Sequence, residues 1–241
     1  MDFTLEKYTE LLTTLKKRNH FSIKHDVDKR PLFSLRIAEI EYSMGIQSTY
    51  YFRSKDFTIH ADIIRKIGSM GHAIGYHYEN LATCHGDMTA AYDDFCRNLE
   101  RLREISPVTT ACAHGSPLSK WNNQDIWNQH DRHSLGIDFE PMLDTDFSRT
   151  LYITDTGRRW DGQAVSIRDK VEQPLSNSFH TTDDIIHAIN DINHPIHHYS
   201  LLINTHPQRW MPFGPSWLTE ALLQSLKNSI KRLINFHHSH D

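Results

Sequence analysis

The chain has 241 residues, of which 38% are hydrophobic and 23% charged, a composition typical of a globular protein with a well-buried core. Its formal net charge of −4 argues against a polyanionic partner such as nucleic acid. Three cysteines without a C-x-x-C pair argue against a disulfide scaffold and for a reducing, cytoplasmic compartment. No apolar stretch approaches the length of a membrane span. The 18 histidines raise the expectation of metal chemistry.

Strand and helix patterns alternate along the chain. After an amphipathic N-terminal helix, strands are predicted at 21–27, 47–53, 72–79, 108–116, 135–141, 150–155 and 199–207. Helices are predicted at 30–45, 60–71, 88–105, 122–130, 181–191 and 216–235. The last carries an apolar stripe, expected to pack on the core or else to form a dimer or membrane-surface face, made of Leu218, Leu222, Leu226, Ile230 and Leu233. This alternation predicts a parallel sheet. Because no linker or repeat interrupts it, we expect a single α/β domain over residues 1–241, built as a barrel or partial barrel.

Polar side chains follow several of the predicted strands at the point where each strand ends. They are Asp26, Asp28, Arg53, His77, Glu79, His114, Asp155 and His206. In a parallel barrel the carboxyl ends of the strands form the face that carries the active site, so these residues are expected to converge on one pocket. The alternative, strand-end residues that only cap helices or bond to the backbone, does not predict such convergence.

The stretch "HDVD" places two acids on one face of a strand, because residues two apart share a face. A cation held by Asp28, with a water between it and Asp26, would separate the roles of the two carboxylates. Asp28, His77 and His114 with a water would match the open geometry of a catalytic zinc site. Asp26 would then accept the water's proton as general base.

Other residues are candidates for supporting roles. His206 is placed to protonate a leaving amine, and Asp155 to orient its imidazole. The two tryptophans Trp160 and Trp210 are candidates for stacking on a sugar ring, with packing over the barrel ends as the equal alternative. Arg53 is a candidate for substrate binding.

The order of "HDVD", "GHAIGYHYE", "HGSP" and "LLINTHP" over about residues 20–210 resembles the metal-dependent polysaccharide deacetylases of carbohydrate esterase family 4. Within that family it looks closest to a branch associated with lipopolysaccharide and O-antigen biosynthesis. The resemblance implies a distorted (β/α) barrel that removes acetyl groups from N-acetylated sugars. It also implies that Asp26 is the base, that Asp28 and His77 are metal ligands, and that His206 is the acid.

One position departs from the family pattern. Leu81 stands where the second motif carries a second histidine ligand, four residues after His77. We expect His114 to supply the third ligand, with Glu79 and His85 as alternatives. Glu79 is also a candidate for substrate binding. Weak or lost metal binding is the other possible consequence of Leu81.

The sequence therefore predicts a cytoplasmic hydrolase of C–N bonds, a sugar N-deacetylase with one divalent metal ion, zinc. Its substrate would be an N-acetylated sugar or glycan intermediate in surface polysaccharide biosynthesis. Three rival functions remain open: another amidohydrolase such as a deformylase or ureide hydrolase, a metal-free amidotransferase on the same glycan, and a non-catalytic carbohydrate-binding protein. The identity of the sugar, its carrier and the oligomeric state do not follow from the sequence.

Overall fold

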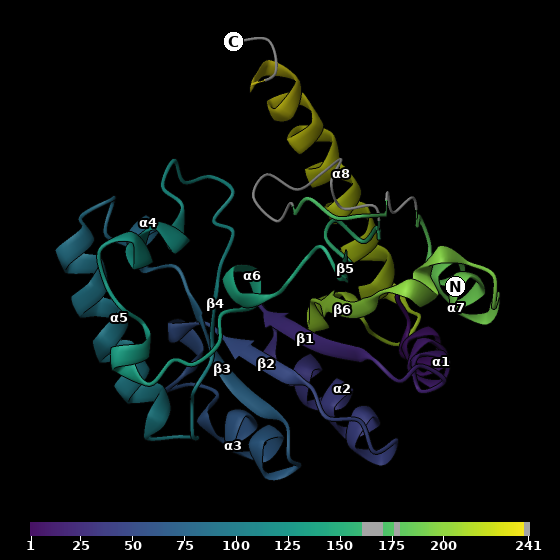
Figure 1. Cartoon of the computed structure of the whole chain (residues 1–241), viewed down its shortest axis with the longest axis horizontal. Helices are drawn as coiled ribbons and strands as arrows, with labels where there is room; N and C mark the ends of the chain where they lie inside the picture. Colours follow the sequence, from purple (N-terminus) through teal and green to yellow (C-terminus); the bar gives the residue numbers. More distant parts are fainter. Residues whose placement is uncertain (161–170, 176–178, 239–241) are drawn as a thin grey trace. The chain divides into compact units, whose positions relative to one another are not determined.

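A computed structural model describes residues 1–160, 171–175 and 179–238 of the chain (Figure 1). The chain forms two compact units, one of residues 25–145 and one of residues 1–24 together with 146–241. The boundary falls inside strand β1 (Phe21–Val27). The six strands are hydrogen-bonded in the order β4-β3-β2-β1-β6-β5. The two units are described in turn.

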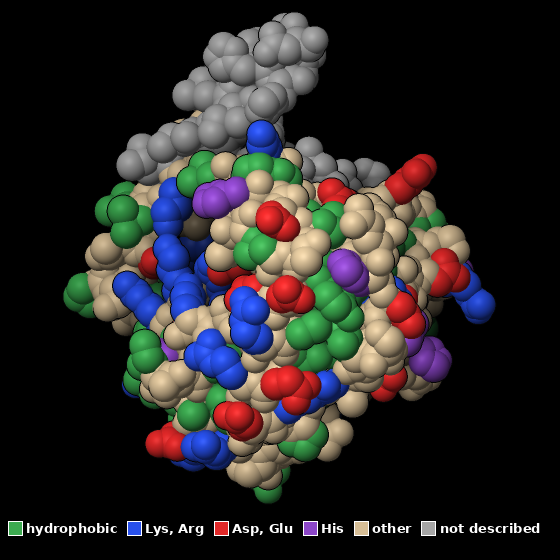
Figure 2. All heavy atoms as spheres, turned by 90° about the vertical axis from the view of Figure 1, so that its left-hand side faces the viewer, with side chains coloured by type: hydrophobic (Ala, Val, Ile, Leu, Met, Phe, Trp, Pro, Cys, Tyr) green, Lys and Arg blue, Asp and Glu red, His purple; other side chains and the backbone are tan. Residues whose placement is uncertain are grey.

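The unit of residues 25–145 continues from β1 through alternating helices and strands. Its helices and strands are α2 (Pro31–Ser43), β2 (Thr49–Phe52), α3 (Ala61–Ser69), β3 (Ala73–Tyr78), α4 (Asn80–Thr83), α5 (Met88–Arg103), β4 (Ala111–Ala113) and α6 (Pro141–Asp144). Short 3₁₀ helices cover Ser54–Asp56, Asn123–Asn128 and His133–Leu135. Figure 1 shows α2 and α3 side by side. Lys and Arg side chains are interspersed with Asp and Glu over the face in Figure 2.

Strand β3 pairs in parallel with β2 on one side and with β4 on the other. The β3–β4 register places His77 opposite Cys112. Gly75 in β3 is required by packing, because a Cβ at this position would lie 2.4 Å from the ring of Tyr51. The Tyr51 hydroxyl lies 2.8 Å from Thr110 Oγ1, next to the start of β4. Gly75 thus lets β2, β3 and β4 pack closely two residues before His77.

The second unit contains the predicted N-terminal helix and the last two strands. Its helices and strands are α1 (Leu5–Leu15), β5 (Thr150–Thr154), α7 (Thr182–Asn190), β6 (Ser200–Thr205) and α8 (Pro215–His238), with 3₁₀ helices at Pro195–His198 and Pro207–Arg209. Strands β5 and β6 are parallel, with Ile153 opposite Ile203. Helix α7 begins with a capping box in which Thr181 and Asp184 bond each other's backbone N–H groups.

The predicted strand at 135–141 is wrong. Its pairing is a single isolated bridge between Thr110 and Phe139. Gly136 adopts a left-handed conformation with φ +66°, which interrupts an extended run. The Glu140 carboxylate accepts hydrogen bonds from the N–H groups of Met142 and Leu143, and so begins helix α6 instead.

The C-terminal helix at 216–235 is present as α8, but the expected packing of its apolar stripe is not observed at the positions that the structure describes. Leu218 is 49% exposed and Leu222 is 72% exposed. The rest of the predicted stripe, Leu226, Ile230 and Leu233, lies outside the described side chains.

A buried polar network links β1, α2 and β2 in the first unit. Glu41 and His25 are fully buried. The Glu41 carboxylate lies 2.9 Å from His25 Nε2 and accepts a 2.6 Å hydrogen bond from the Tyr50 hydroxyl. A buried carboxylate held by such partners is costly to remove, since its partners then lose their counterpart in a dry environment.

We therefore expect Glu41→Ala to lower the free energy of unfolding by about 3–5 kcal/mol. The exposed Glu39, which lies 3.3 Å from Lys66, is the matched control, and Glu39→Ala is expected to cost at most about 1 kcal/mol. Urea unfolding of the two variants measures both values. Equal losses in the two variants would contradict a structural role for the buried network.

Candidate metal centre

Asp28 lies immediately after strand β1. Its backbone N–H donates to the carbonyl of Asp26 at 3.0 Å, which turns the chain at the strand end. Lys55 Nζ donates to the Asp28 carbonyl at 2.8 Å and fixes the turned backbone. The side chain of Asp28 retains 20% exposure at this position.

His77 is the most constrained residue of the group. It lies in β3 and is 2% exposed. Its Nδ1 is 2.9 Å from the carbonyl oxygen of Cys112 in the neighbouring strand. Because a carbonyl can only accept, Nδ1 carries the proton, and the lone pair of the neutral imidazole is on Nε2. This Nε2 lies 3.5 Å from Asp28 Oδ1.

His114 approaches the same carboxylate oxygen from the end of β4. Its backbone N–H donates to the Tyr78 carbonyl at 2.8 Å, which continues the β3–β4 pairing. Its Nε2 lies 3.5 Å from Asp28 Oδ1, the same distance as His77 Nε2. The donor atoms of Asp28, His77 and His114 all lie within 4.8 Å of one another.

These separations fit a shared divalent ion. A charge-assisted hydrogen bond between imidazole and carboxylate would be about 2.7–2.9 Å long, clearly shorter than the two observed distances. Two ligand atoms on a tetrahedral zinc ion, each about 2.0–2.1 Å from the metal, are about 3.4 Å apart. Asp28 and His114 are 20% and 17% exposed, so the open side of the group can admit a water or a substrate.

Glu79 and Arg53 support His114. Glu79 Oε2 lies 3.2 Å from His114 Nδ1, and Arg53 holds the other carboxylate oxygen through Nε at 2.8 Å and through a second, close contact from Nη2. Burial alone would raise the pKa of Glu79, but hydrogen bonds and charge from His114 and Arg53 outweigh it and lower the pKa to about 2. Glu79 is therefore a carboxylate at neutral pH. Ser116 also contacts His114 Nδ1, through its Oγ at 3.0 Å and its N–H at 3.3 Å. The Glu79 carboxylate favours a proton on Nδ1, and this tautomer leaves Nε2 able to bind a metal.

Sequence reasoning missed Asn123, which holds the loop that carries His114. Asn123 is 1% exposed, and its Nδ2 donates to the His114 carbonyl at 2.7 Å and to Ser116 Oγ at 3.0 Å. Its Oδ1 accepts from the N–H of Ala82 in α4. Leu81, which precedes Ala82 in α4, is 3% exposed, and its side chain has no atom that could bind a metal. A lone asparagine in a polar loop carries no sequence signal for this role.

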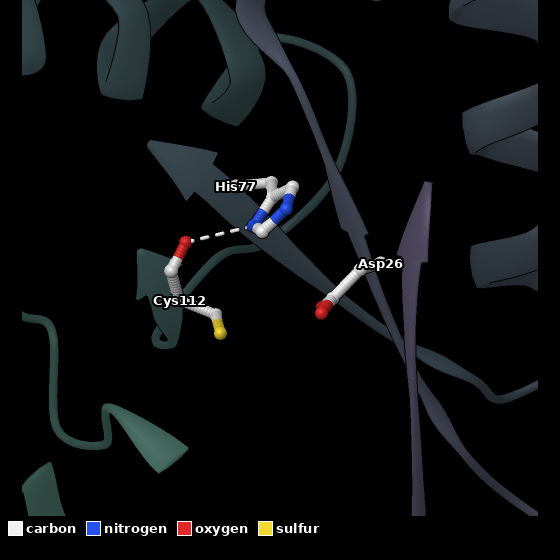
Figure 3. A group of neighbouring side chains, drawn as sticks. All are labelled: Asp26, His77 and Cys112. Carbon is white, nitrogen blue, oxygen red and sulfur yellow. Dashed lines mark hydrogen bonds between the residues drawn. The ribbon is translucent and has the colours of Figure 1, made fainter. Parts of the chain in front are cut away.

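Cys112 was also missed. Together with Asp26 and His77 it forms a second group whose donor atoms lie within 4.8 Å of one another (Figure 3). Asp26 and Asp28 therefore both lie close to His77. His85 belongs to neither donor group; its ring lies 6.0 Å from that of Trp121.

Asp155 and His206 belong to the second unit, where they contact each other. Asp155 Oδ1 lies 2.6 Å from His206 Nδ1 and 2.6 Å from Arg209 Nη1, and its Oδ2 accepts from Trp210 Nε1 at 2.9 Å. Asp155 is fully buried. Burial would raise the pKa of Asp155, but the charges of Arg209 and His206 and the bonds from His206 hold it below its usual value. The sequence-based expectation that Asp155 orients His206 matches this contact.

The two tryptophans proposed to stack on sugar lie inside the second unit. Trp210 is 0% exposed and Trp160 is 2% exposed. Their rings are 5.9 Å apart, and both lie against Phe3, at 6.1 Å from Trp160 and 5.0 Å from Trp210. Trp160 Nε1 donates to Thr182 Oγ1. Since neither ring has an exposed face, sugar stacking by these residues is not supported, and the packing alternative is what the structure shows.

Comparison with solved structures gives several similar folds. A carbohydrate esterase family 4 (CE4) esterase from Streptococcus mutans is 14% identical with a TM-score of 0.50, and the match covers 95% of this chain and 88% of that one. A CE4 family pseudoenzyme from Bacillus anthracis is 13% identical with a TM-score of 0.49, covering 89% and 62% of the two chains. A family 4 carbohydrate esterase from Streptomyces lividans, in complex with acetate, is 11% identical with a TM-score of 0.46, covering 89% and 90%.

No protein-family model and no curated protein sequence matches the chain. The match to the Streptococcus mutans esterase shows the fold, and the predicted fold class, an α/β chain of the polysaccharide deacetylase type, is confirmed. Among the described residues, no helix has both the length and the apolar character needed to cross a membrane.

The contact between Glu79 and His114 predicts a loss of metal affinity in Glu79→Gln. The amide cannot replace the carboxylate as a charged acceptor for His114 Nδ1, so zinc affinity is expected to fall about 10–100-fold. Competition with a chelator of known affinity measures the change. Glu39→Gln, an exposed change on α2, is the control. Unchanged affinity in Glu79→Gln would contradict the supporting role.

The buried contacts of Asp155 predict a pH-dependent effect of Asp155→Asn. Because the folded pKa is depressed, the carboxylate stabilises the protein fully above the pKa of an unfolded aspartate, about 3.9, and loses this contribution as the pH falls through the folded value. At pH 7 the variant is expected to be about 3–5 kcal/mol less stable, because Arg209 stays buried without its counterion. The difference should shrink below pH 4 in urea unfolding, and a pH-independent difference would contradict the ion pair.

Proposed function

We propose that this protein is a metal-dependent carbohydrate deacetylase that hydrolyses the amide of an N-acetylated sugar. The observation that carries the proposal is the arrangement of His77 and His114, whose Nε2 atoms both lie 3.5 Å from one oxygen of Asp28. Two imidazoles and one carboxylate with an open side are the ligand set of a hydrolytic zinc centre. The fold shared with a CE4 esterase supports the same reaction class.

Asp28, His77 and His114 would hold the ion, and Cys112, Glu79 and Arg53 keep the two imidazoles in place. When bound, such an ion lowers the pKa of a water to about 7 and polarises the acetyl carbonyl. Asp26 is 7% exposed, and its carboxylate lies within 4.8 Å of a ring nitrogen of His77, the residue shared with the candidate metal centre. We propose that its carboxylate accepts the proton of the attacking water.

The remaining predictions for the reaction concern the second unit and the substrate. His206, with Nδ1 directed at Asp155, has Nε2 as its second ring nitrogen, and we propose that it donates the proton to the leaving amine. A glycan intermediate of O-antigen biosynthesis as substrate, and zinc as the native ion, rest on the motif resemblance alone.

The three rival functions differ in what supports them. A deformylase or ureide hydrolase would use the same residues, so only the released product separates it from a deacetylase. A metal-free amidotransferase gives no reason for two imidazole nitrogens to converge on one carboxylate oxygen. A carbohydrate-binding protein that uses Trp160 and Trp210 is disfavoured by the burial of both rings.

The proposal is tested by measuring bound metal and product together in the parent protein, Asp28→Ala and Asp26→Asn. The parent is expected to hold one divalent ion per chain and to release acetate from N-acetylglucosamine oligosaccharides. Asp28→Ala should lose both. Asp26→Asn should retain the ion and lose about 10²–10⁴-fold in rate, because it lacks only the base.

Asp62→Asn, on the exposed surface of α3, is the matched control and should behave as the parent. Full acetate release by Asp28→Ala would contradict the metal mechanism. Formate or ammonia as the product, in a panel of amide substrates, would support the rival amidohydrolase.

A further inference from the structure

A sulfur donor, Cys112, lies beside the candidate metal centre. Figure 3 shows the side chains of Asp26, His77 and Cys112, from β1, β3 and β4, pointing toward one another. A carboxylate oxygen, a ring nitrogen and Sγ all lie within 4.8 Å of one another. The three residues are 7%, 2% and 1% exposed. Three kinds of metal-binding atom therefore converge in a space that is shielded from solvent.

This second group shares one residue with the candidate metal centre. His77 Nδ1 is engaged by the Cys112 carbonyl, so Nε2 is the ring atom that can bind an ion in either group. The same Nε2 faces Asp28. One nitrogen lone pair binds one ion, so the two positions cannot be filled at the same time.

The two groups differ in the softness of their donors. Asp28 and His114 offer oxygen and nitrogen to complete the first position, whereas Cys112 adds sulfur to the second. Thiolate ligands favour soft cations, and carboxylate and imidazole ligands accept harder ones. A change of cation would therefore change which position is occupied.

We propose that Asp26, His77 and Cys112 form a second cation position, specific for thiophilic divalent ions such as Cd²⁺, that excludes an ion at Asp28, His77 and His114. On binding, the sulfur–metal bond forms as the Cys112 thiol releases its proton to solvent, with no change in oxidation state. The consequence for activity rests on the proposed function. An ion in this position occupies both the base Asp26 and the ligand His77, so thiophilic ions inhibit hydrolysis.

Cobalt(II) is the probe, because a cobalt–thiolate bond gives an intense near-ultraviolet charge-transfer band that oxygen and nitrogen ligands do not give. The background protein carries Cys84→Ser and Cys96→Ser, to remove the other thiols, and His114→Ala, to remove a ligand of the first position. Titration with Co²⁺ alone is expected to produce the band. Adding Cys112→Ser should abolish it, and adding Asp26→Asn should weaken Co²⁺ binding by about tenfold or more.

Asp62→Asn, an exposed change of the same chemistry, is the control and should leave the titration unchanged. Circular dichroism and thermal unfolding verify that each variant is folded, and Cys112→Ala provides a second removal of the thiol. A band that persists in folded Cys112→Ser or Cys112→Ala overturns the proposal. Absence of the band in the folded background protein at saturating Co²⁺ also overturns it.

Inhibition is measured separately, with Cd²⁺ and the acetate-release assay, relative to the uninhibited rate of each protein. Cys112→Ser is expected to raise the half-inhibiting concentration by about tenfold or more over Cys96→Ser. The two proposals fail in different ways. No acetate release from any protein, with the cobalt band intact, rejects the proposed function, whereas acetate release without the band rejects the second cation position.

Discussion

The hydrogen bond from His77 Nδ1 to the Cys112 carbonyl is the interaction on which the candidate centre depends. The bond connects two paired strands, β3 and β4. The orientation of the His77 imidazole therefore depends on the register of these strands. The bond selects the tautomer with a lone pair on Nε2, and it directs this nitrogen at Asp28. Neither effect needs a mobile loop, because both partners lie in regular structure. A ligand fixed in this way loses little conformational entropy when an ion binds.

His114 is held differently, by side chains from a loop and from neighbouring elements. Glu79 and Arg53 form a charged pair beside its Nδ1, while Asn123 holds its carbonyl. The pKa of Glu79, lowered to about 2, keeps that carboxylate charged at any pH at which the imidazole can bind a metal. At His114 the Glu79 carboxylate therefore has the role that the Cys112 carbonyl has at His77, as a partner of Nδ1. The two imidazoles reach the same oxygen of Asp28 by these two different means.

The sequence predicted the parts of the fold that local pattern determines. The apolar run at 72–79 predicted β3, which is observed at Ala73–Tyr78. The i, i+2 spacing in "HDVD" predicted that Asp26 and Asp28 share one face, and the carboxylates of both lie near His77. The strand expected at 135–141 was wrong because a left-handed glycine and a carboxylate that caps a helix outweigh a short apolar pattern.

Other features depend on contacts between residues far apart in the chain, which local pattern does not contain. Trp210 is buried against Phe3 and donates to Asp155, 55 residues earlier in the chain. The role of Asn123 follows from its hydrogen bond to the His114 carbonyl, after β4. Cys112 in β4 and Asp26 in β1 come together although 86 residues separate them along the chain. The Leu81 departure from the family motif led to the prediction of His114 as the third ligand, and His114 lies near Asp28 and His77 in the structure.

The candidate centre requires that Asp28, His77 and His114 bind one divalent ion together. Anomalous diffraction at the zinc absorption edge, from crystals of the protein loaded with one equivalent of zinc, tests it most directly. We expect a single anomalous peak within bonding distance of one Asp28 oxygen and of the Nε2 atoms of His77 and His114. A loaded crystal with no peak there, or with the peak held by other residues, would contradict it.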